Sequence, residues 1–103
     1  MSESELSKPV VTTVDFTIDA DLEVDLLDGY AELNRGPTPD GLVRSELLRS
    51  FDGSWRIQTT WRDRDALMAL RRSGQPPAAL TLLERLEVEH SHSVFTVELS
   101  FEF

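Results

Sequence analysis

The chain has 103 residues, with ten Lys and Arg against nineteen Asp and Glu and a formal net charge of −9. This length suits one domain with a single core. So acidic a chain repels phosphate backbones and anionic membranes, and we expect neither nucleic acid nor a membrane as a partner. With no cysteine, disulfides, thiolate metal sites and cysteine nucleophiles are excluded. No apolar run approaches the ~20 residues that cross a bilayer, and the N-terminus is polar, so we expect a cytoplasmic protein.

Residues 1–8 are charged and almost free of apolar side chains, which predicts a flexible tail before one domain over residues 9–103. The run PVVTTVDFTI, residues 9–18, is β-branched and alternating, and it predicts the first strand. One face of this strand carries Val10, Thr12, Val14, Phe16 and Ile18.

The next segment predicts a helix from an N-cap at Asp19 or Asp21 to about Asn34. Its apolar residues recur at helical spacing: Leu22, Leu26, Leu27, Tyr30 and Leu33. Acidic residues occupy the opposite face, which is typical of a solvated helix face rather than of a metal site. Residues 35–41, RGPTPDG, then end the helix and turn the chain.

Residues 40–63 predict a hairpin folded about Asp52-Gly53, because Asp-Gly favours a two-residue turn with positive φ. In that register Leu48 lies opposite Ile57 and Arg44 lies opposite Trp61. One face then carries Leu42, Leu48, Trp55, Ile57 and Trp61.

The other face of this predicted hairpin also carries apolar side chains, namely Val43, Leu47 and Phe51. Because neither face is plainly polar, we expect the chain's own helices to cover one face and a second copy to cover the other. The same register places Arg49 opposite Arg56, which is unfavourable.

Two helices and a strand follow. Asp63 or Asp65 is expected to cap a helix that ends at Gly74 and turns Ala66, Leu67 and Leu70 inward. Pro76-Pro77 begin a third helix, with an apolar face of Ala79, Leu80, Leu83 and Leu86. Residues 87–93 are predicted as a polar connection and residues 94–103 as the last strand, which pairs at a sheet edge or reaches a partner subunit.

The order strand, helix, hairpin, helix, helix, strand predicts an α+β, ferredoxin-like β-α-β-β-α-α-β arrangement with an antiparallel sheet. Two sequence features accompany this order. One is a strand that carries Gly41, Glu46, Leu47, Leu48 and Arg49, and the other is Trp61 shortly before a capped helix. Together they resemble the antibiotic biosynthesis monooxygenase superfamily. The resemblance implies a homodimer of the dimeric α/β-barrel type, with a ligand cavity between sheet and helices.

Some members of that superfamily oxygenate anthrone-type aromatic polyketides without metal or flavin. Trp61 matches the tryptophan that ends the third strand in the family, whereas Ile57 replaces an expected asparagine and Leu67 an expected tyrosine. The expected substrate-binding residues are Tyr30, Arg44, Ile57, Trp61, Leu67 and Leu70. Trp61 and, if it faces the helices, Asp15 are the catalytic candidates, Asp15 as a base; the alternative for Asp15 is a satisfied strand-edge carboxylate.

The functional hypotheses are a cofactor-independent monooxygenase acting on an aromatic polyketide or quinone-type molecule, and a non-catalytic ligand-binding or assembly dimer of the same fold. Haem binding or degradation is a third, although the asparagine, tryptophan and histidine of that branch are not found. We expect no cofactor. His90 and His92 could ligate a metal with Glu87 or Glu89, but two histidines in a polar segment are more often solvated, and we predict no metal site.

Overall fold

The computed structural model describes residues 7–74 and 77–103, so most of the expected tail, residues 1–6, and Pro76 of the expected third helix lie outside the described residues. Four strands form one antiparallel sheet in the order β2-β3-β1-β4. The predicted α+β, ferredoxin-like arrangement is confirmed. In chain order the elements are β1 (Val10–Phe16), η2 (Ala20–Leu22), α1 (Glu23–Leu33), β2 (Leu42–Arg49), β3 (Trp55–Trp61), α2 (Arg64–Arg72), α3 (Ala78–Arg85) and β4 (His90–Thr96).

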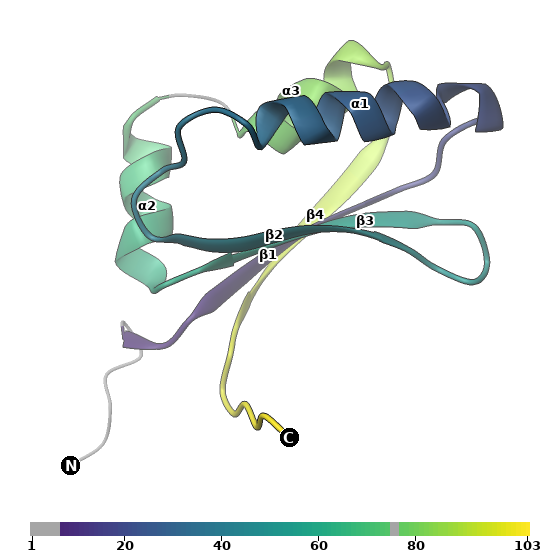
Figure 1. The fold of residues 1–103 in the computed structure, drawn as a ribbon. Helices are drawn as coiled ribbons and strands as arrows, with labels where there is room; N and C mark the ends of the chain where they lie inside the picture. The colour runs from purple at the N-terminus through teal and green to yellow at the C-terminus, as the bar shows by residue number, and fades with distance from the viewer. Residues whose placement is uncertain (1–6, 75–76) are drawn as a thin grey trace.

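The helices lie on one side of the sheet (Figure 1). Helices α1 and α3 pack together over one end of the strands, and α2 lies over the other end. The opposite face of the sheet carries no helix among the described residues, and the C-terminal segment lies below it. In the same part of the chain, no helix has the length and apolar character needed to span a bilayer.

The β2–β3 hairpin forms as predicted, but its loop is different. Ser50 and Ser54 pair through a 2.8 Å hydrogen bond from the Ser50 N–H to the Ser54 carbonyl, which leaves three residues in the loop. Only Gly53 of these has positive φ, at 91°. The Gly53 N–H bonds back to the Ser50 carbonyl, so the loop is a turn followed by a left-handed glycine. The Asp52 carboxylate accepts from the Ser54 N–H at 2.9 Å.

The extra loop residue shifts the strand pairing by one, so the predicted register is wrong. Leu47, rather than Leu48, lies opposite Ile57, and Trp61 lies opposite Leu42 across a bulge. Because side chains alternate along a strand, a shift of one exchanges the two faces of β2. Arg44 therefore lies opposite Thr60 and does not pair with Trp61.

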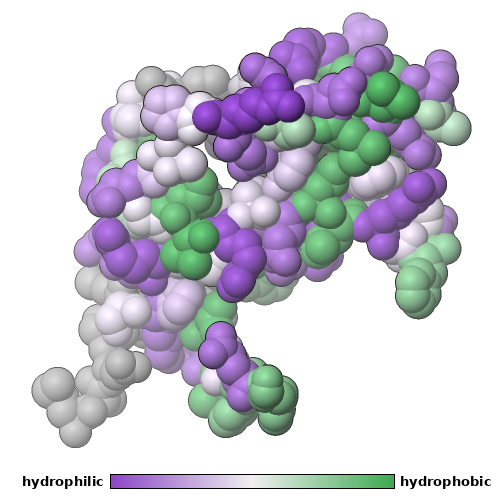
Figure 2. Space-filling model, in the orientation of Figure 1, coloured by the Kyte–Doolittle hydropathy of each residue, from purple (hydrophilic) through white to green (hydrophobic). Residues whose placement is uncertain are grey.

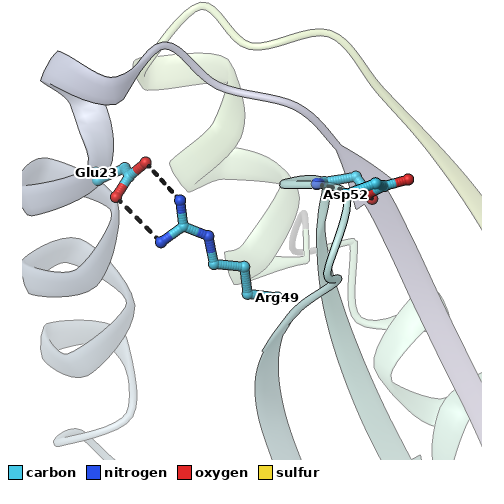
Figure 3. A network of polar contacts seen from close by, with 4 residues as sticks. Glu23, Arg49 and Asp52 are labelled. Carbon is cyan, nitrogen blue, oxygen red and sulfur yellow. Dashed lines mark hydrogen bonds and ion pairs between the residues drawn. The ribbon is translucent and has the colours of Figure 1, made fainter.

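The shift also removes the expected clash of arginines. Arg49 now lies opposite Trp55, with its guanidinium carbon 4.9 Å from the centre of the indole ring. The same guanidinium reaches helix α1, where it donates to both Glu23 carboxylate oxygens at 3.2 and 3.5 Å (Figure 3). Arg49 thus connects the hairpin end to the first turn of α1.

The predicted helices are found, but the expected cap of the first at Asp19 or Asp21 is wrong: Asp19 precedes η2 without a side-chain cap hydrogen bond, Asp21 lies within η2, and α1 begins only at Glu23. Asp63 caps α2, accepting from the Ala66 N–H at 2.9 Å, and Gly74 follows the helix with a φ of 79°. On α1, Leu26 is fully buried, but Leu27 is 49% exposed and is not part of the inward face. On α3, Leu82 is buried beside the expected Leu83.

Strand β4 begins earlier and ends earlier than predicted. Residues 90–93, expected in a polar connection, pair with β1, and Thr96 pairs with Val10 at its start. After Thr96 the Val97 N–H still donates to the Pro9 carbonyl at 2.9 Å, but residues 98–103 run past β1 with no described strand beside them, and residues 97–103 form no strand. Every second side chain of this tail is nevertheless apolar, and Leu99, Phe101 and Phe103 are 81%, 73% and 118% exposed.

Candidate functional site

The helix-facing side of the sheet can be read in rungs, because residues directly opposed across antiparallel strands share a face. Buried Val10, Val14 and Phe16 identify this side of β1. Following the pairings outward gives four rungs. They are Arg49–Trp55–Phe16–His90, Leu47–Ile57–Val14–His92, Ser45–Thr59–Thr12–Val94 and Leu42–Trp61–Val10–Thr96.

The buried core divides into two clusters along these rungs. The larger cluster lies under α1 and α3 and contains Phe16, Val14, Trp55, Ile57, Leu26, Leu82, Leu83 and Val88. The smaller cluster lies under α2 and contains Val10, Trp61, Ala66 and Leu67. The rung between them carries hydroxyl groups, and we call Ser45, Thr59 and Thr12 the hydroxyl row. Its three members are all half-buried.

Two aromatic side chains reach the hydroxyl row from opposite ends of the sheet. Trp61 donates its indole N–H to the Thr12 hydroxyl at 3.3 Å. Tyr30 comes down from α1, and its hydroxyl lies 2.5 Å from the Ser45 hydroxyl. Both tyrosine and tryptophan are amphipathic, so they place an apolar wall and a polar tip at the same spot. Figure 2 shows pale, weakly polar atoms between green apolar patches in the middle of the view.

The hydroxyl row can bind the carbonyl or hydroxyl groups of a flat, largely apolar molecule, with the side chains of Trp61 and Tyr30 on either side of it. Hydroxyl side chains both donate and accept, so they can bind either group. We find no carboxylate or basic side chain within the hydroxyl row itself.

Of the residues expected to bind substrate, Tyr30 and Trp61 border the hydroxyl row, while Ile57 is buried in the larger cluster and Leu67 in the smaller. Leu70 packs against the smaller cluster from α2.

Arg44 and Asp15 lie on the other face of the sheet. Arg44 is exposed opposite Thr60, with Glu46 at 3.8 Å. Asp15 lies opposite Arg56 and accepts from its Nε at 2.7 Å, an ion pair that raises the pKa of Arg56. Asp15 therefore does not face the helices, which was the condition for its expected role as a base.

The hydroxyl row was not predicted, although the sequence places two of its three members on the correct face. Thr12 falls on the predicted inward face of the first strand. Thr59 was recognisable as the residue two before Trp61, and therefore on the same face as the tryptophan. Ser45 was placed on the wrong face by the register.

Two hollows lie elsewhere on the surface. The larger, about 580 Å³, is on the outside of α2 between Arg62, Arg72 and the exposed carboxylates Asp40 and Asp65. The second, about 400 Å³, lies between α1 and α3. Neither hollow is lined by a residue of the hydroxyl row. We place the candidate site at the row because Trp61 and Tyr30 converge on it.

The electrostatics beside Trp61 fix the start of α2. Asp63 has a lowered pKa because its carboxylate accepts from the Ala66 N–H and also faces Arg62. In turn, Asp63 and Asp40 raise the pKa of Arg62. The backbone N–H of Arg62 also donates to the Gly41 carbonyl at 2.7 Å. These contacts position the backbone directly after the tryptophan.

Both histidines lie on β4 rather than in a connection. By the rungs, His90 and His92 face the helix side, and His90 Nδ1 lies 3.2 Å from the Val88 carbonyl. Among the described residues, no three histidine or acidic side chains are placed to hold a metal ion.

No protein-family model and no curated protein matches the chain. Among solved structures it is similar to SnoaB, a cofactor-independent oxygenase from Streptomyces nogalater, with 28% identity, 90% of this chain and 96% of that one covered, and a TM-score of 0.60. A heme-degrading protein from Mycobacterium tuberculosis, Rv3592, has 20% identity over 94% and 99% of the two chains and a TM-score of 0.69. A protein from Deinococcus radiodurans, provisionally named an antibiotic biosynthesis monooxygenase, has 13% identity over 91% and 97% and a TM-score of 0.69.

Proposed function

Since the chain has the fold of the antibiotic biosynthesis monooxygenase superfamily, we propose that it binds an aromatic small molecule over the hydroxyl row and oxygenates it without a cofactor. The observation that carries the proposal is the convergence of Trp61 on Thr12 and of Tyr30 on Ser45 between two apolar clusters. SnoaB, similar in fold and 28% identical, is a cofactor-independent oxygenase.

The reaction requires few catalytic groups from the protein. An electron-rich phenolate or carbanion can pass an electron to oxygen itself, so the protein needs only to orient the substrate, exclude water and favour its deprotonated form. Trp61 and Tyr30 would hold the ring system. The hydroxyl row would bind the carbonyl oxygen on which negative charge develops.

The proposal includes a homodimer formed through the uncovered face of the sheet. That face has Thr13 at the middle of β1, and on either side of the Thr13 rung the apolar side chains of Leu48 and Phe95 are 39% and 53% exposed. Exposed apolar side chains that share one face favour burial against a partner surface. The apolar tail, residues 97–103, lies below the same face (Figure 1) and needs cover. A second copy packed on this face would cover these side chains and the tail.

The dimer is tested by light scattering on the full chain, which should give twice 11.7 kDa. Ser93 is exposed in the rung of Thr13, so Ser93→Glu should weaken the dimer, while Ala31→Glu on the exposed side of α1 should not. A mass of 11.7 kDa for the unaltered chain, with concentration raised into the millimolar range, would contradict the proposal.

The binding site is tested by oxygen uptake with a tricyclic anthrone, with metals chelated. Thr59→Val removes one hydroxyl of the row at nearly constant volume, and Thr60→Val makes the same change on the opposite face. We expect Thr59→Val to lower kcat/KM about tenfold, as the loss of about 1.4 kcal/mol from one hydrogen bond predicts. Thr60→Val should leave it unchanged. Equal effects of the two variants, or no uptake by the unaltered protein, would refute the proposal.

A non-catalytic binding protein is the second candidate, favoured by Ile57, which is 1% exposed where the resemblance expects an asparagine. It predicts ligand binding without uptake. The Trp55→Phe variant leaves Trp61 as the chain's single tryptophan, so quenching of its fluorescence reports binding at the site.

The hypothesis of haem binding, suggested by the likeness to the heme-degrading protein from Mycobacterium tuberculosis, predicts a shift of the Soret band when haem is mixed with the protein.

A further inference from the structure

We infer that His92 is the group that accepts the substrate's proton, an inference that rests on the proposed oxygenase function. The hydroxyl row contains only neutral hydroxyls, which are poor bases near neutral pH. Histidine is the side chain that exchanges a proton in that range. The chain has two histidines, and both lie on β4.

The pairing of β4 with β1 places His92 beside the candidate site. His92 lies directly opposite Val14, and Val94 lies opposite Thr12. His92 is therefore one rung from the hydroxyl row and diagonal to Thr12, a spacing of about 7–8 Å between backbones that an imidazole side chain can reach across. Val14 is buried on the helix side of β1, so His92 projects to the side of the sheet that carries the row.

The surroundings of His92 suit a base that must pass its proton to water. β4 is an edge strand whose only strand neighbour is β1 in the described chain, and His92 is exposed. On this side its neighbours on β1 are Thr12, Val14 and Phe16, and on β4 they are His90 and Val94. His90 is thus the one titratable side chain that faces it from these two strands.

The step is a simple proton transfer. In an anthrone, the C–H bond of the methylene between the rings breaks, and an N–H bond forms on the neutral imidazole of His92. The electron pair stays on the substrate as an enolate, which then reduces molecular oxygen. The methylene and one oxygen molecule give a carbonyl and water, and the imidazolium releases its proton to solvent.

His90 provides a matched control. It lies on the same strand and the same side, two residues away, but in the rung of Phe16 and Trp55, farther from the hydroxyl row. Its ring also lies against the Val88 carbonyl. His90→Gln and His92→Gln change the same chemistry at two positions along one edge.

The experiment is exchange of the anthrone methylene protons with D₂O under anaerobic conditions, followed by NMR, together with oxygen uptake as a function of pH. We expect His92→Gln to slow exchange about 100-fold, with fluorescence-detected binding and thermal stability unchanged. His90→Gln should leave both exchange and oxygen uptake as they are in the unaltered protein. Exchange that His92→Gln leaves intact would overturn the inference while leaving the oxygenase proposal standing. Exchange by the unaltered protein without oxygen uptake would instead refute the oxygenase function alone. Absence of both exchange and uptake would refute both.

Discussion

Gly41 is the residue at which the fold around Trp61 is most sensitive to a single methyl group. It has a φ of 86°, where an L side chain costs about 1–2 kcal/mol. A Cβ built on it would lie 2.3 Å from the Cβ of Ala66 on α2, far inside van der Waals contact. Overpacking of this kind costs a further 1–3 kcal/mol or so. We therefore expect Gly41→Ala to lower the free energy of unfolding by about 3 kcal/mol.

Substitutions at two other glycines distinguish the cost of backbone strain from the cost of steric overlap. Gly53 has a φ of 91° but an open surrounding, so Gly53→Ala should cost only the backbone term of about 1–2 kcal/mol. Gly36 has neither constraint, and Gly36→Ala should change stability by no more than about 0.5–1 kcal/mol. Urea denaturation with an unchanged m-value measures all three.

The contact itself is tested by the double variant Gly41→Ala with Ala66→Gly. Removing the Ala66 methyl opens the space that the new methyl needs, so the double variant should be about 1–2 kcal/mol more stable than the sum of the single changes predicts. If the changes in the free energy of unfolding are strictly additive, or if Gly41→Ala costs no more than Gly53→Ala, a side chain at residue 41 has no steric conflict with α2.

Arg49→Ala should lower stability by about 1 kcal/mol through loss of the ring contact with Trp55 and a half-exposed ion pair. Glu23→Gln should cost less and only at low salt; equal costs would argue against the ring contact. Asp63, whose pKa is lowered by the Ala66 N–H and Arg62, stabilises the fold above the ordinary aspartate value of 3.8, and this contribution is lost as pH falls through its folded pKa. Asp63→Asn should therefore reduce the pH dependence of Tm below pH 4, and an unchanged pH dependence would contradict the role of the Asp63 carboxylate as the cap of α2. Tyr30→Phe removes the contact with Ser45, and we expect about a tenfold rise in KM with little change in folding; an unchanged KM would exclude Tyr30 from binding.

The element order could be read from the sequence because its signals are local. Alternation on β1, the cap at Asp63 and the glycine after α2 each act within a few residues, and each is found as predicted. The hairpin register could not be read in the same way. Asp-Gly permits a two-residue turn, but Asp52 keeps negative φ and its carboxylate bonds to Ser54 instead, which favours the three-residue loop.

The candidate site depended on pairings that no local pattern determines. One loop residue decides whether Ser45 or Arg44 faces the helices. In β4, serine and histidine have weak strand preference, and it is hydrogen bonding to β1 that makes residues 90–93 a strand. Conversely, the alternation of residues 97–103 is strong, but beyond Val97 the described part of the chain offers no strand beside it.

The division of the core into two clusters also has a consequence for motion. The α2 end of the domain is held by four buried apolar side chains, against eight under α1 and α3. Local opening costs less where fewer apolar contacts must be broken. Amide protons of α2 should therefore exchange with solvent through an opening that leaves α1 and α3 protected. Such an opening would lift Ala66 and Leu67 from Trp61 and give a bulky ring system a way in that the static surface does not offer.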